Sequence, residues 1–157
     1  MSEPGNAAAS AELDALVEES HRGLDAFFKG DSGPVKPLFS RRDDVTLANP
    51  FGPPRRGWSA VEEAMDRAAA NYRDGGAFGF AEVSRFVTPE LAYIVELEHY
   101  QAKVGGSTEM ATVSLRCTTI FRREDDGWKI VHRHADPITV ARSADSVTAS
   151  PIGSGSS

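Results

Sequence analysis

The chain has 157 residues, 40% of them hydrophobic, which is enough for one compact domain with an apolar core. Its formal net charge of −6 argues against a nucleic acid or an anionic membrane as partner, because both attract basic patches. The single cysteine, Cys117, excludes an intramolecular disulfide. Because the sequence contains no signal peptide and no apolar run that spans a bilayer, we expect a cytoplasmic protein.

The first half of the chain carries helical patterns. Residues 1–9 are small and polar and predict a disordered tail. Apolar residues then recur at helical spacing over 11–29, and residues 31–40 predict a short second helix. A third helix begins at Ser59, where a capping box is present, and ends at Gly75.

The second half predicts a sheet. A short strand over 44–50 precedes the third helix, and four long strands follow it over 78–87, 91–104, 108–123 and 127–138. From 141 to 157 the composition becomes rich in serine and glycine, which predicts a second disordered tail. We therefore expect a single domain over 10–140. Its class is α+β, with three N-terminal helices packed on one face of a curved antiparallel sheet and a cavity between them.

Titratable groups alternate along the last strand. In GWKIVHRHADP, Trp128 shares a face with His132, His134 and Asp136, whereas Arg133 takes the opposite face. Histidine titrates near neutral pH and acts as an acid, a base or a ligand. This strand face therefore begins with apolar side chains and ends with side chains that can accept or donate a proton.

A third histidine lies in LAYIVELEHYQ. His99 is in phase with Tyr93, Val95 and Leu97, which are apolar and therefore expected to face inward. Glu96 and Glu98 then take the other face as solvated or interfacial charges.

The order of elements, together with DDVTLANPFGPPRRGWSAVEEAM and GWKIVHRHADP, resembles the nuclear transport factor 2-like (NTF2-like) superfamily. Its SnoaL-like and ketosteroid-isomerase-like members, including the DUF4440 type, are the most similar. The final motif, with its tryptophan and histidines, also resembles the hub domain of calcium/calmodulin-dependent kinase II. The resemblance implies a cone-shaped, cystatin-like α+β barrel. It also implies a homodimer formed through the outer sheet face, where Ile94, Ile120 and Val131 are expected.

The same resemblance points His132 and His134 into the pocket, where Asp136 would orient His134. In the alternative, one histidine packs in the core, the other lies at the mouth, and Asp136 is a solvated strand end. Ketosteroid isomerases place a base at the position of Asn49 and oxyanion donors at those of Gly23 and Thr119. An amide at the first of these positions cannot take a proton, so we do not expect that mechanism.

Further pocket candidates are apolar or weakly polar residues expected inside the cone. They are Asn49, Trp58, Met65, Tyr93, Val95, Leu97, His99, Cys117, Thr119 and Trp128. No ligand spacing for a metal and no phosphate-binding loop is present, so we expect neither metal nor cofactor.

Two hypotheses of function follow. In the first, the protein binds a small apolar molecule, and any catalysis is cofactor-free isomerisation, cyclisation or dehydration by pocket histidines. In the second, it is a non-catalytic ligand-binding or oligomerisation module like the hub.

Overall fold

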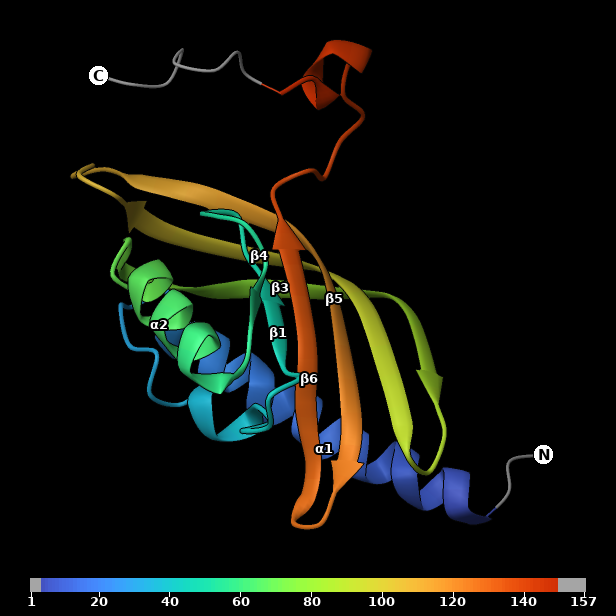
Figure 1. Ribbon diagram of the computed structural model, residues 1–157. Coiled ribbons are helices and arrows are strands. Elements are labelled where there is room, and N and C mark those ends of the chain that lie inside the picture. Colours follow the sequence, from blue (N-terminus) through green and yellow to red (C-terminus); the bar gives the residue numbers. More distant parts are fainter. Residues whose placement is uncertain (1–3, 150–157) are drawn as a thin grey trace.

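A computed structural model of the protein describes residues 4–149, and Figure 1 shows its elements in chain order. The helices are α1 (Pro4–Phe27) and α2 (Trp58–Ala69), with short 3₁₀ turns η1 (Lys36–Leu38) and η2 (Ala144–Val147). The strands are β1 (Thr46–Ala48), β2 (Arg55–Arg56), β3 (Tyr72–Val87), β4 (Leu91–Val104), β5 (Met110–Glu124) and β6 (Gly127–Asp136). None of the helices within 4–149 is both long and apolar enough to cross a membrane.

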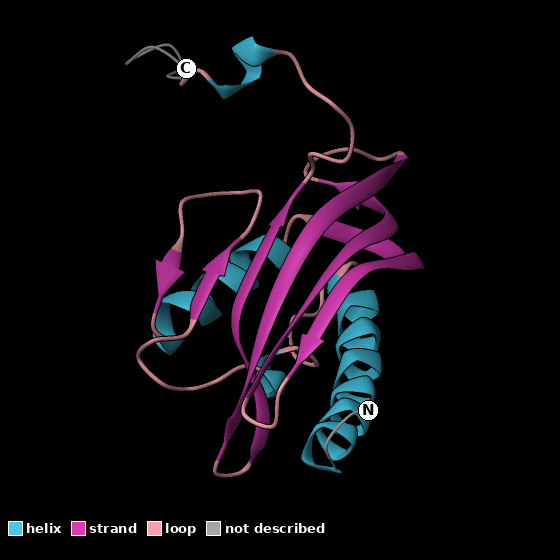
Figure 2. Cartoon of the chain, turned by 90° about the vertical axis from the view of Figure 1, so that its right-hand side faces the viewer, coloured by secondary structure: helices cyan, strands magenta, loops and turns pink. Residues whose placement is uncertain are grey.

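The strands form one open, curved sheet. Its order is β2-β1-β6-β5-β4-β3, and every pairing is antiparallel except that of β1 with β6. Figures 1 and 2 show α1 lying along this sheet, and α2 packs near β1 and β2. The predicted α+β class and curved sheet are confirmed, with one parallel pair added.

The helical half differs from expectation in three places. The second helix predicted over 31–40 is wrong, because this segment contains two prolines and forms only the three-residue turn η1. Residues 4–9, expected to belong to a frayed tail, form the first part of α1, and Ala9 is buried. The pair Gly75-Gly76 lies within β3 at a register shift and does not end a helix.

A β-bulge in β6 reverses the alternation of its side chains. Phe121 of β5 pairs with Ile130, but the preceding Ile120 pairs with His132, so Val131 is an extra residue. A single extra residue turns every following side chain to the other face. Ile130 therefore faces the helices, as does Arg133 three residues later. The sequence prediction assumed an unbroken alternation.

The side chains of β4 are also inverted relative to the prediction. Ile94, Glu96, Glu98 and Tyr100 are buried beneath the helices, so Glu96 and Glu98 are not the solvated or interfacial charges expected. The apolar residues between them face outward. Ile94 is 2% exposed, and its predicted place on the outer face is therefore wrong.

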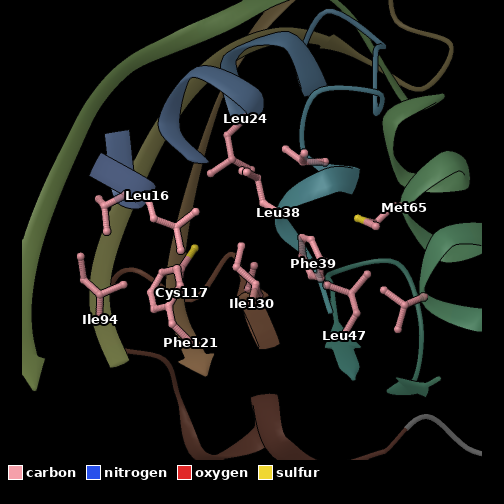
Figure 3. Packing of buried hydrophobic residues seen from close by; sticks show 14 of the residues in the cluster. Leu16, Leu24, Leu38, Phe39, Leu47, Met65, Ile94, Cys117, Phe121 and Ile130 are labelled. Carbon is pink, nitrogen blue, oxygen red and sulfur yellow. The ribbon is translucent and has the colours of Figure 1, made fainter. Parts of the chain in front are cut away.

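The core fills the space between the helices and the inner sheet face (Figure 3). It includes Leu16 and Leu24 of α1, Phe39 after η1, Met65 of α2 and Ile130 of β6. Burying side chains of this size stabilises the fold by roughly 1.5–3 kcal/mol each before entropy is counted. The helices are thus held on the sheet by apolar packing.

The backbone at Gly75 lies close to Phe28, directly after α1, so a substitution at Gly75 tests how α1 is held against the sheet. An added Cβ there would lie 2.6 Å from the carbonyl oxygen of Phe28 and also collide with that of Gln101. We expect Gly75→Ala to lower the free energy of unfolding by about 1–3 kcal/mol or more. Gly106→Ala is the matched control, because an added Cβ there meets no atom of the described residues within 4 Å, its chain neighbours aside. Equal melting temperatures for the two variants would contradict this packing.

Candidate functional site

An apolar cavity of about 50 Å³ lies between the helices and the inner sheet face. Its walls come from α1, the segment around η1, β1, α2 and the inner face of the sheet. They include Leu24, Phe28, Phe39, Leu47, Met65, Leu115, Ile130 and Ala135. Most of this lining is aliphatic or aromatic, which is typical of small-molecule sites.

Among the residues that the structure describes, four with polar side chains line this cavity. They are Ser20 of α1, Asn49 after β1, Tyr72 at the start of β3 and Arg133 of β6. None is a histidine or a carboxylate. The cavity therefore presents mainly hydrogen-bond donors, together with hydroxyl and amide groups that do not act as bases near neutral pH.

Arg133 is fixed by a buried ion pair with Glu98. Its two terminal nitrogens donate to the two carboxylate oxygens over 2.8 and 2.7 Å. The Arg133 side chain is 11% exposed and that of Glu98 is fully buried. The Tyr100 hydroxyl donates to the same carboxylate at 2.5 Å. Such a paired, bidentate geometry is what makes a buried charge tolerable.

A second carboxylate, Glu96, lies on the same strand face and contacts α1. His21 Nε2 lies 3.0 and 3.1 Å from its two oxygens. The His21 ring also stacks on Phe80, with 3.6 Å between ring centroids. Strand β4 is thus tied to β6 through Glu98 and to α1 through Glu96.

The two carboxyl groups have opposite pKa shifts. Burial alone would raise the pKa of Glu98, but the charge and hydrogen bonds of Arg133 outweigh it and lower the pKa. For Glu96, burial dominates and raises the pKa, although His21 partly opposes it and the Glu98 charge adds to it. Glu98 is therefore the permanent anion of the cluster.

Tyr72 is the second donor that faces the cavity. Burial raises the pKa of Tyr72 to about 12, partly offset by the nearby charge of Arg133. Its ring packs on Phe28, with centroids 4.1 Å apart. At neutral pH the phenol is protonated and can therefore donate a hydrogen bond.

Phe51 lies between this cavity and an outer depression of about 380 Å³. Both spaces are lined by Leu47, Asn49, Phe51 and Ala68. Phe51 is 48% exposed and contacts the Tyr72 ring, with centroids 5.8 Å apart. The outer depression also contains Arg55 and Arg67, which both pair with Glu63.

The predicted catalytic histidines lie on the other face of the sheet. Because of the bulge, Arg133 and Ala135 line the cavity, while His132, His134 and Asp136 point away from it. The expected inward orientation is therefore wrong.

These outward side chains have local partners. His132 Nδ1 lies 2.7 Å from the Thr46 hydroxyl. Burial is the larger cause that lowers the pKa of His132, and the charge of the neighbouring His134 lowers it further. His134 pairs with Asp136 over 3.0 Å. Asp136 also accepts a 2.8 Å hydrogen bond from Arg116. Within residues 4–149, no three His, Cys, Asp or Glu side chains are arranged to hold a metal ion.

The four candidates from β4 are also outside the cavity. Tyr93 and Val95 line an outer groove, and Leu97 follows them on the same face. His99 is half-buried there, and its Nδ1 lies 2.8 Å from the Ser114 hydroxyl. Their predicted inward orientation is wrong, because the paired charges of β4 occupy the inner face.

The remaining candidates divide between the cavity and the surrounding core. Asn49 and Met65 line the cavity, as expected. Cys117 and Thr119 are buried on the inner face beside it, and burial raises the pKa of the Cys117 thiol. The two tryptophans belong to or pack against the core and do not line the cavity. Trp128 donates to Glu12 of α1 at 3.0 Å, and Trp58 lies under the guanidinium of Arg41.

Sequence reasoning missed Arg133, Tyr72 and Glu98 as site residues. One available signal was the pattern Ile94, Glu96, Glu98, Tyr100, in which two carboxylates share phase with large apolar residues. An arginine on a neighbouring strand could have been their partner, but the bulge that turns Arg133 inward leaves no mark in the sequence.

The Arg133–Glu98 pair predicts different costs for two similar substitutions. Glu98→Gln leaves a buried guanidinium without its anion, and we expect a loss of about 3–5 kcal/mol in the free energy of unfolding. Glu96→Gln keeps the size and polarity of the side chain and can still hydrogen-bond His21, so its cost should be about 1 kcal/mol. Urea denaturation at pH 7 measures both. Equal losses of unfolding free energy in the two variants would contradict this predicted difference.

The pH dependence of stability follows from the same pair. The folded pKa of Glu98 lies below its unfolded value near 4.5, so its contribution is present above that pH and is lost as the pH falls. Glu98→Gln should therefore flatten the acid-side decline in the free energy of unfolding.

Comparison with solved structures places this geometry in a known fold. A provisionally assigned dehydratase of the NTF2-like family from Streptomyces avermitilis is similar, with a TM-score of 0.68, 19% identity, and coverage of 86% of this chain and 99% of that one. A ketosteroid isomerase-like protein from Erwinia carotovora atroseptica has a TM-score of 0.65 and 14% identity over 88% of this chain and 100% of that one.

A provisionally assigned association domain of calcium/calmodulin-dependent protein kinase II from Xanthomonas campestris is also similar. Its TM-score is 0.62, with 14% identity, 83% of this chain and 88% of that one covered. No curated protein sequence matches the chain significantly. At these identities the likeness concerns the fold. The SnoaL-like domain model, in contrast, matches residues 21–139, and the chain therefore belongs to the SnoaL-like domain family.

Proposed function

We propose that this protein binds a small, largely apolar molecule in the cavity beneath α1 and α2. The observation that carries the proposal is a buried apolar space into which Arg133 and Tyr72 both project. Few polar groups converging in an apolar cavity are characteristic of ligand sites. A merely structural void would not require an arginine at its wall.

The route of entry is past Phe51. The inner cavity of about 50 Å³ is smaller than typical ligand sites, which occupy roughly 300–1,000 Å³. The neighbouring depression of about 380 Å³ shares the wall formed by Phe51. Because the ring is half exposed, rotating it outward joins the two spaces and admits a ligand of ordinary size.

The cavity favours binding over acid–base turnover. The structural relatives described as a provisional dehydratase and an isomerase-like protein suggest proton-transfer chemistry, which needs a group that titrates near neutral pH. The polar side chains at this cavity are Ser20, Asn49, Tyr72 and Arg133. They can orient and polarise a ligand, but they do not supply a general base.

Methionine NMR tests this proposal, because Met65 lines the cavity and Met110 is exposed on β5. With ¹³C-methyl methionine labelling, 1-indanone should shift the Met65 signal in a saturable way and leave Met110 unchanged. Ala135→Leu should abolish the shift by filling the cavity.

His134→Gln is the control variant, because it alters the outer face of the same strand and should preserve binding. Loss of binding in His134→Gln with retention in Ala135→Leu would refute the cavity as the site and return attention to the histidines.

A second proposed property is self-association through the outer sheet face. Phe86, Leu91 and Tyr93 are 56, 50 and 37% exposed there, and with Val95 and Ile120 they line a groove of about 290 Å³. Large exposed apolar patches commonly mark interfaces. Ile120 was expected on this face, whereas Ile94 is in the core and Val131 lies at the bulge.

Light scattering measures this association directly. We expect a dimer for the wild-type chain at micromolar concentration and a monomer for Val95→Glu, since a carboxylate in an apolar interface must be desolvated. Val147→Glu, on the exposed turn η2, should remain dimeric. A monomeric wild-type protein would contradict the proposal.

A further inference from the structure

We infer that the cavity selects an uncharged ligand with a carbonyl or similar acceptor oxygen, which Arg133 and Tyr72 bind together. This inference rests on the proposed function and adds the chemical class of the ligand. It depends on three features of the site: the donors that have no protein partner, the charge balance behind them, and the scarcity of acceptors at the wall.

Arg133 retains donors after pairing with Glu98. A guanidinium carries five N–H bonds, and the ion pair uses two of them, one from each terminal nitrogen. Three are therefore left without a protein acceptor among the described residues, on a side chain that forms part of the cavity wall. A ligand oxygen at this wall would satisfy a donor that the ion pair does not use.

Tyr72 supplies a second donor at the same wall. Its hydroxyl has no hydrogen-bond partner among the described residues, and its buried ring contacts Phe28 and Phe51. The contrast with Tyr100 is informative. Tyr100 is also buried, but its hydroxyl donates to Glu98 and it does not line the cavity. One tyrosine completes the ion pair and the other faces the ligand space.

The charge balance argues for a neutral ligand. Glu98 already compensates Arg133, so a bound carboxylate would add an unpaired negative charge close to a permanent anion. Like charges in a poorly hydrated site repel strongly, and burying an unpaired charge is costly. A ketone, lactone or quinone oxygen accepts hydrogen bonds without this cost. The cations Arg55 and Arg67 belong to the outer depression rather than to this wall.

Acceptors at the wall are few. The Asn49 side-chain oxygen already accepts a 2.9 Å hydrogen bond from the Phe51 amide, which uses one of its two lone pairs, and its amino group can donate to a ligand. Arg133 and the protonated Tyr72 donate. A ligand whose polar group is only a donor would therefore find little to bind. The site favours acceptor oxygens.

Three probes of similar shape separate these contributions: 1-indanone, indane and indane-1-carboxylate, each titrated while the Met65 methyl signal is followed. For the wild-type chain we expect 1-indanone to bind about tenfold more tightly than either of the others. Tyr72→Phe should weaken 1-indanone about fivefold and leave indane unchanged.

Tyr93→Phe is the matched control, since it removes a hydroxyl from the same kind of ring on the outer sheet face, away from the cavity and from the Arg133–Glu98 pair. It should keep the preference for the ketone. A merely structural role for Tyr72 predicts the same ketone preference in both variants.

The outcomes distinguish the inferred preference for an acceptor oxygen from the proposed binding function. Equal affinities for 1-indanone and indane would overturn the inference and leave the proposed binding function intact. Tightest binding of the carboxylate would overturn the charge argument. If none of the three probes shifts Met65, the proposed function fails as well.

Discussion

The buried ion pair between Arg133 and Glu98 is the interaction on which the rest of the structure depends. It joins strands β4 and β6 across β5, and it decides which side chains of both strands can face the helices. A charge in such a place is expensive unless it is paired and hydrogen-bonded, which the bidentate contact and the Tyr100 hydroxyl accomplish. Once Glu98 is inside, the alternation of β4 places the apolar Tyr93 and Val95 outside.

The same pair links the fold to its candidate site. Arg133 pairs with the buried Glu98 and also forms part of the cavity wall. A side chain held in this way can position a ligand oxygen without losing much conformational entropy on binding, because its rotamer is already fixed. Tyr72 is held comparably by aromatic packing against Phe28. The site is therefore preorganised on strands rather than on loops.

Much of the fold is predictable from sequence, since it depends on local periodicity. The amphipathic pattern of α1 and the two-residue turn Asp125-Asp126 between β5 and β6 each have a short-range cause. The site is less predictable, because the bulge at Val131 has no sequence signature and inverts the roles of His132 and Arg133. On β4, apolar residues alternate with charged ones, and only the partner across the sheet decides which row is buried. A row of apolar side chains on one strand face can lie at an interface between molecules as well as in the core.

The most direct test of this account is a crystal structure of the protein soaked with 1-indanone. The account predicts the ring beneath α1 and α2, with the ketone oxygen within hydrogen-bond distance of both the Arg133 guanidinium and the Tyr72 hydroxyl, and Phe51 displaced if the site is enlarged. A molecule bound in the outer groove beside Tyr93, or in the cavity with its oxygen turned away from Arg133, would contradict it.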